Sequence, residues 1–107
     1  MQNGVIYDEL GNPQNLVAKT PIVINKTLTT QNTEYSQVLP AGTKCFTLQA
    51  RTATDIKLCF TALASDTTYI TLKSGSSYSE EGIDLSNKTL YMQAASDGVV
   101  IEIVAWV

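Results

Sequence analysis

Histidine does not occur in this sequence of 107 residues, and charged side chains are scarce, at 16% of the chain. Without histidine the chain has no imidazole base, no histidine metal ligand and no Ser-His or Cys-His nucleophile pair. This composition removes the commonest means of catalysis. We therefore expect a protein that is not an enzyme and that needs no cofactor.

Positive charge is also in short supply. Seven Lys and Arg stand against ten Asp and Glu, which gives a net charge of −3. Contacts with nucleic acid or with an anionic membrane need a basic surface, so we expect neither partner. Apolar runs are too short for a membrane helix, and residues 1–4 (Met-Gln-Asn-Gly) lack the basic start of a signal peptide. The chain is thus expected to be made and assembled in the cytoplasm.

Cysteine is rare, with only Cys45 and Cys59 present. Two cysteines at this spacing match neither a zinc site nor a redox pair. Two free thiols are the expected state, because no secretory signal is recognised. A disulfide is the alternative if both residues lie on the outward faces of neighbouring hairpin strands.

Carboxylates gather at one point, where Glu80, Glu81 and Asp84 surround Gly82. Such a group suits a calcium site or an acid–base pair. The alternating ligand run of an EF-hand is missing, however. We interpret residues 78–84 as a solvated loop between two strands and predict no metal site.

The dominant pattern is a two-residue alternation of apolar and polar side chains, which is typical of half-buried strands. Within 44–51, for example, Phe46, Leu48 and Ala50 share one face. The expected strands cover residues 22–30, 33–38, 44–51, 56–61, 69–73, 90–94 and 99–107. Turn signals such as Pro40-Ala41-Gly42 separate them. Seven or eight short strands predict an all-β, antiparallel β-sandwich of the jelly-roll or immunoglobulin-like type.

We expect the sandwich domain to span residues 22–107, preceded by an extended N-terminal arm at 1–21. Turn signals at Asn3-Gly4 and Gly11-Asn12-Pro13 interrupt regular structure there. Between them lie two apolar clusters, made up of Val5, Ile6 and Tyr7 and of Leu16 and Val17. An arm of this kind either lies on its own domain or reaches a neighbouring subunit, so both clusters are interface candidates.

Aromatic residues also occupy outward positions of the expected strands. Tyr69, Tyr91 and Trp106 fall opposite the Ile/Leu/Val stripe, and Val100 and Val104 share the outward side of the last strand. Left uncovered, Tyr91, Val100, Val104 and Trp106 would form an apolar patch of the kind that marks protein contacts. Outward aromatics also stack on sugar rings. The third interpretation is that the arm or other strands cover this face.

Four segments carry a resemblance to known proteins: 38–51, 69–75, 90–94 and 99–107. They combine a Pro-Gly turn, an aromatic-centred strand and an apolar C-terminal strand that ends in Trp106. In this the chain resembles the small virion proteins of tailed bacteriophages, over residues 38–107.

The resemblance implies a non-enzymatic β-sandwich accessory protein that acts by protein–protein contacts. Its role would be capsid decoration or stabilisation, or a head–tail, tail or fibre function, so it would be located in the virion. Expected partners are capsid, portal or tail proteins, and a second copy of the chain in a homo-oligomer. The alternative is a carbohydrate-binding or host-attachment module that uses Tyr69, Tyr91 or Trp106 as a stacking surface.

Overall fold

The protein, analysed as a computed structural model, is built of β-strands joined by turns and loops. The structure describes residues 6–7, 13–14 and 20–107, and it contains no helix in these ranges. The strands are β1 (Ile6–Tyr7), β2 (Pro13–Gln14), β3 (Pro21–Leu28), β4 (Tyr35–Val38), β5 (Cys45–Ala50), β6 (Ile56–Cys59), β7 (Ile70–Leu72), β8 (Ser77–Glu81), β9 (Thr89–Ala94) and β10 (Val99–Trp106). The predicted all-β class is confirmed.

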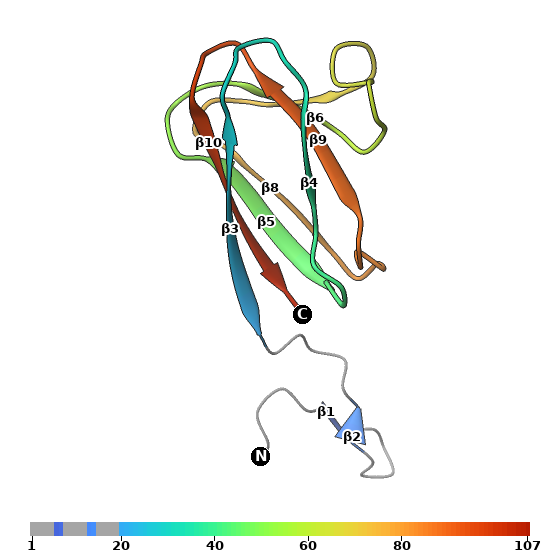
Figure 1. The fold of residues 1–107 in the computed structure, drawn as a ribbon. Coiled ribbons are helices and arrows are strands. Elements are labelled where there is room, and N and C mark those ends of the chain that lie inside the picture. Colours follow the sequence, from blue (N-terminus) through green and yellow to red (C-terminus); the bar gives the residue numbers. More distant parts are fainter. Residues whose placement is uncertain (1–5, 8–12, 15–19) are drawn as a thin grey trace.

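Strands β3 to β10 form two four-stranded sheets, with the orders β3-β10-β5-β8 and β4-β9-β6-β7. All pairings are antiparallel, and the two sheets form the two layers visible in Figure 1. The strands pair in a nested order. β3 pairs with β10, β4 with β9, β5 with β8, and β6 with β7. This is jelly-roll connectivity, one of the two predicted types of sandwich.

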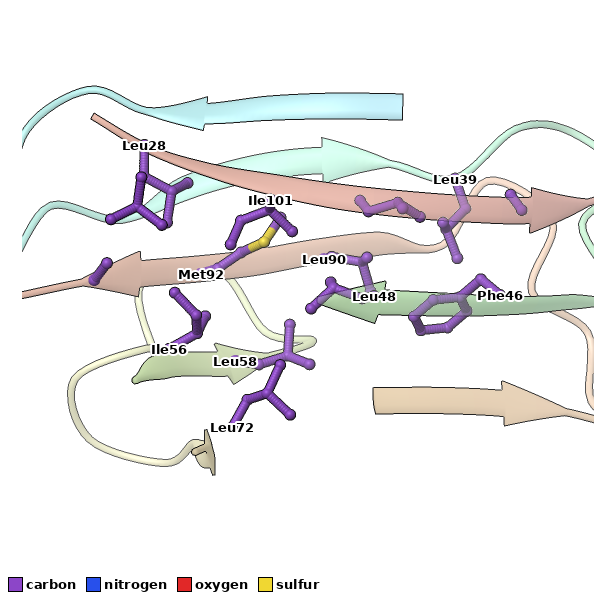
Figure 2. Close-up of a cluster of buried hydrophobic side chains, with 14 of the residues drawn as sticks. Leu28, Leu39, Phe46, Leu48, Ile56, Leu58, Leu72, Leu90, Met92 and Ile101 are labelled. Carbon is purple, nitrogen blue, oxygen red and sulfur yellow. The ribbon is translucent and has the colours of Figure 1, made fainter. Parts of the chain in front are cut away.

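The core forms where the inward stripes of the two sheets meet. On β10 the inward residues Val99, Ile101, Ile103 and Ala105 are buried, while the residues between them are only partly covered. Residues of the other sheet face them across the layer, and Figure 2 shows Met92 and Leu90 between the sheets beside Ile101. Burial of one such side chain contributes roughly 1.5–3 kcal/mol, so this interior is the main source of stability.

The Pro40-Ala41-Gly42 turn is confirmed. The N–H of Thr43 donates to the carbonyl oxygen of Pro40 at 3.2 Å, and Gly42 has a φ of 81°. A positive φ at the third position, but not at the second, defines a type II turn, which favours Gly at the third position. The turn carries the chain from β4 in one sheet to β5 in the other.

One prediction about local structure is wrong. Residues 77–81 form β8, an edge strand paired with β5, and not a loop, because Tyr78 and Glu80 point inward opposite Leu48 and Phe46. The alternation was hidden by the polar residues that an edge strand tolerates.

The strands that carry Cys45 and Cys59 are not hairpin neighbours, so the condition for the disulfide alternative is not met. β5 and β6 belong to different sheets, since the jelly roll sends each successive strand across the core until β6 pairs with β7. Both thiols are free, as expected. Cys59 is nevertheless buried and not outward-exposed, for a reason given below.

Of the predicted arm, residues 1–21, the structure describes β1, β2 and residues 20–21. Strands β1 and β2 pair antiparallel, with Ile6 opposite Gln14. Val5, Leu16 and Val17 lie outside the described residues. β3 begins at Pro21, next to the predicted domain boundary.

Candidate functional site

The outer surface of the β3-β10-β5-β8 sheet, called here the β10 face, is a candidate contact surface. The strand register arranges its side chains in rows across the sheet. One row contains Pro21, Trp106, Cys45 and Glu81; the next contains Val23, Val104, Thr47 and Ser79; the third contains Asn25, Glu102, Gln49 and Ser77. Val23 is 69% exposed and Trp106 39% exposed. The first two rows therefore give the face an apolar part on β3 and β10, which polar residues border on β8 and in the third row.

The charged residue Glu102 borders the apolar part of this face on one side. The Glu102 carboxylate accepts hydrogen bonds from Gln49 Nε2 and from Arg51 Nε, both at 3.1 Å. The hydrogen bond from Gln49 lowers the pKa of Glu102 most, and the hydrogen bond from Arg51 lowers it further. A shallow hollow of about 330 Å³ lies between Glu102 and the apolar pair Val23 and Val104. The surface thus offers a hollow with an apolar side beside the ion pair of Glu102 and Arg51.

The structure brings together three of the predicted interface residues and separates a fourth. Val100, Val104 and Trp106 all lie on the β10 face, on alternate residues of one strand. Tyr91 lies on β9 in the other sheet, where it is paired with Ser36 and Cys59. Jelly-roll connectivity is the reason, because β9 and β10 are consecutive in the chain but belong to opposite layers.

The outer surface of the β4-β9-β6-β7 sheet is covered in part by the chain itself. Residues 60–69, which connect β6 to β7, lie over the outward positions of β6 and β9. Gln93 and Ser65 are both buried there, and Gln93 Nε2 donates to Ser65 Oγ at 2.9 Å. This loop also explains the burial of Cys59, whose Sγ donates to the carbonyl oxygen of Thr61 at 3.3 Å. Among the described residues, this face is therefore covered in part, and the cover is the 60–69 loop.

The Glu34 carboxylate is one of two polar attachments of this loop. Glu34, in the connection between β3 and β4, accepts the backbone N–H of Leu63 at 2.7 Å and that of Ser65 at 3.0 Å. The Ser65 hydroxyl and these two N–H groups lower the pKa of Glu34. Lys57 holds the loop a second time, donating to Asp66 at 2.9 Å, which raises the pKa of Lys57. The loop is thus attached to the sheet by polar contacts on both sides.

A larger apolar hollow, of about 550 Å³, opens where this loop meets the edge between β7 and β8. Tyr78 packs there against Phe60 with ring centroids 6.3 Å apart, and against core Phe46 at 5.8 Å. Burial raises the pKa of Tyr78, with a smaller effect of nearby Glu80. Ile70 and Tyr69 form the outer part of the hollow and stay about two-fifths exposed.

Most of this hollow was not predicted from the sequence. A strand is expected over residues 56–61, but β6 ends at Cys59 and Phe60 is 41% exposed. Tyr78 was placed in a loop. Only Tyr69 was recognised as a candidate, since it was expected to point outward. No local pattern marks the other two, because the hollow is formed by residues from both sheets.

The edges of the β10-containing sheet carry charges at inward positions. Lys26 on β3 pairs with buried Ile101, and its Nζ lies 5.9 Å from the ring centroid of Tyr35. Glu80 on β8 pairs with buried Phe46 at the opposite edge. A charge at such a position makes it costly to add another strand to the edge. Contacts through the faces and the hollow are therefore favoured over edge-to-edge pairing.

Within residues 6–7, 13–14 and 20–107, the structure contains no group of His, Cys, Asp or Glu side chains suited to hold a metal ion. The same part of the chain has no helix long and apolar enough to cross a membrane. Comparison of the chain with protein-family models, with curated proteins and with solved structures finds no match.

Proposed function

We propose that this chain is a non-enzymatic structural protein of a tailed-bacteriophage virion, and that it docks on other virion proteins through the β10 face. The observation that carries the proposal is the contrast between the two outer surfaces of the sandwich. One is covered in part by the chain's own loop, whereas the other leaves Val23 and Trp106 exposed beside Val104. Exposed apolar centres with polar margins are typical of protein contact surfaces.

Two further points support a virion role. The resemblance over residues 38–107 is to virion accessory proteins, and jelly rolls recur in viral capsid domains. Fold alone does not determine function, so the argument depends on the surface. On a symmetric particle each copy repeats the same contact, and many weak contacts together give a stable attachment.

Mass spectrometry of purified virions tests the proposal directly, and the chain is expected among the particle proteins. Trp106→Ser should lower the amount that is retained, since tryptophan is among the residues that dominate interface energy. Val38→Ser is the matched control, because Val38 is 49% exposed but lies on the other sheet. Absence of the chain from virions, together with a strictly monomeric state in solution, would reject the proposal.

A carbohydrate-binding or host-attachment module is the second candidate, favoured by the aromatic hollow. Phe60, Tyr69 and Tyr78 line one open apolar surface, and aromatic rings of this kind stack on the apolar faces of sugars. A glycan array probed with the intact chain is the test. Binding that is lost in Tyr69→Ala would support this candidate, and an array without a hit would remove it.

A further inference from the structure

The 60–69 loop is folded within itself. The N–H of Ala64 donates to the carbonyl oxygen of Thr61 at 3.3 Å, and the N–H groups of Thr67 and Thr68 donate to the carbonyl oxygen of Ala64 at 3.1 and 2.9 Å. Among the described residues, these are all the backbone–backbone hydrogen bonds that the loop makes. The loop can therefore move as one piece without breaking any pairing between strands.

Hydrogen bonds between the loop and the rest of the domain run through side chains. Glu34 accepts two of the loop's N–H groups, and Lys57 donates to Asp66. Gln93 donates to Ser65, which in the part of the chain that the structure describes is the one buried residue of the loop. A segment that buries so little apolar surface opens at a low cost in free energy. A few polar contacts therefore decide whether the loop stays closed.

Backbone strain at Leu63 works against these contacts. Its φ is 63°, and its side chain is 88% exposed, so no packing compensates for this left-handed conformation. The other residues besides glycine with a positive φ in the described ranges are Asn32 and Asn87, of a type that tolerates this conformation. Leucine does not tolerate it, and such strain persists only where the surrounding structure enforces it. Here Glu34 enforces it, because its carboxylate accepts the N–H of Leu63 at 2.7 Å.

We propose that the 60–69 loop is a hinged cover that opens while the sandwich stays folded, and that strain at Leu63 favours its opening whereas the Glu34 carboxylate opposes it. Opening uncovers the outward positions of β6 and β9. Among them is Cys59, whose Sγ donates to the carbonyl oxygen of Thr61 in the closed loop. The inference goes beyond the proposed function, because docking there uses the β10 face, which belongs to the other sheet.

Labelling of Cys59 with a disulfide reagent measures the opening. In the full chain carrying Cys45→Ser, Cys59 is the only thiol, and its labelling rate follows the open fraction when closing is faster than labelling. Leu63→Asn relieves the strain and should slow the labelling about 5-fold. Leu63→Ala is the matched control, because it removes the exposed side chain but keeps the Cβ and with it the strain, so its rate should stay within about 2-fold. Glu34→Gln should label about 10-fold faster.

A variant of the opposite sheet separates opening of the loop from unfolding of the whole domain. Ile103→Val, at a buried position of β10, should raise the unfolded fraction about 2- to 10-fold in urea titrations. The labelling rate of Cys59 in water should nevertheless stay unchanged. Labelling that rises in step with the unfolded fraction would overturn the inference, as would equal rates for Leu63→Asn and Leu63→Ala. Neither result bears on whether the chain occurs in virions.

Discussion

Replacement of Glu34 by Gln should loosen the 60–69 loop. The carboxylate accepts two N–H groups, from Leu63 at 2.7 Å and from Ser65 at 3.0 Å. Glutamine keeps one oxygen but turns an NH₂ group toward the second donor, so one bond is lost and the other loses its charge. Hydrogen bonds to charged groups contribute about 1.5–3 kcal/mol each, and partial solvent exposure lowers this. The expected loss of loop stability is about 1–2 kcal/mol.

Native-state hydrogen exchange is the appropriate measurement, because the loop can open without global unfolding. The amide protons of Leu63 and Ser65 should exchange about 10-fold faster in Glu34→Gln, as about 1.4 kcal/mol corresponds to a factor of ten. Core amides of β9 and β10 should change less. Glu81→Gln, which removes a carboxylate from exposed β8, is the control and should leave the loop unaffected. If the Leu63 and Ser65 amides of Glu34→Gln exchange at the wild-type rate, Glu34 does not hold the 60–69 loop in place.

The same carboxylate makes the loop acid-sensitive. The pKa of Glu34 is lower in the folded protein than its ordinary value of 4.5. Its contribution is therefore complete above about pH 4.5 and is lost as the pH falls through the folded pKa. Protection of the Leu63 and Ser65 amides, corrected for intrinsic exchange, should fall over that range in the wild type. In Glu34→Gln this acid dependence should be absent, and its persistence would show that other groups control the loop.

Three other outcomes are expected. Leu58→Ala, at a fully buried position, should lower the free energy of unfolding by about 2–5 kcal/mol in urea titrations, whereas Val23→Ala should stay within about 0.5 kcal/mol. Lys26→Val should increase concentration-dependent aggregation seen by light scattering, because it removes the inward charge from the β3 edge, and Lys26→Arg should not. A thiol reagent should modify Cys45 at least about 10-fold faster than buried Cys59, and denaturation should abolish the difference. Equal rates in the native protein would contradict the loop cover over Cys59.

Local chemistry made much of the architecture predictable. Alternation of Phe46, Leu48 and Ala50, and of Val99, Ile101 and Ile103, identified strands whose buried faces the structure confirms. The turn at Pro40–Gly42 was also predicted correctly from the sequence. Both features depend only on residues close in the sequence, namely the two-residue period of a strand and the φ preferences of Pro and Gly. An all-β sandwich follows from them without knowledge of the strand order.

The candidate sites depended on the pairing of distant strands. Tyr91 and Trp106 have the same outward signature in the sequence, yet the jelly roll places them on opposite layers. The sequence predicts a loop over residues 78–84, because the polar residues of an edge strand resemble those of a turn. Such residues are identified only when the partner strand β5 is known.

The amino-acid sequence by itself therefore determined which segments are strands, which of their faces are apolar and where the chain turns. Only the tertiary structure decided which faces are covered, that the Glu34 carboxylate helps to hold the 60–69 loop, and that Phe60, Tyr69 and Tyr78 share a hollow. The physical reason is the distance along the chain over which each effect acts. Dihedral preferences and side-chain alternation depend only on residues that are close in the sequence. The covering of a sheet face, the attachment of the loop and the apolar hollow arise instead from contacts between residues far apart in the chain. Glu34 with Ser65 and Phe60 with Tyr78 are examples.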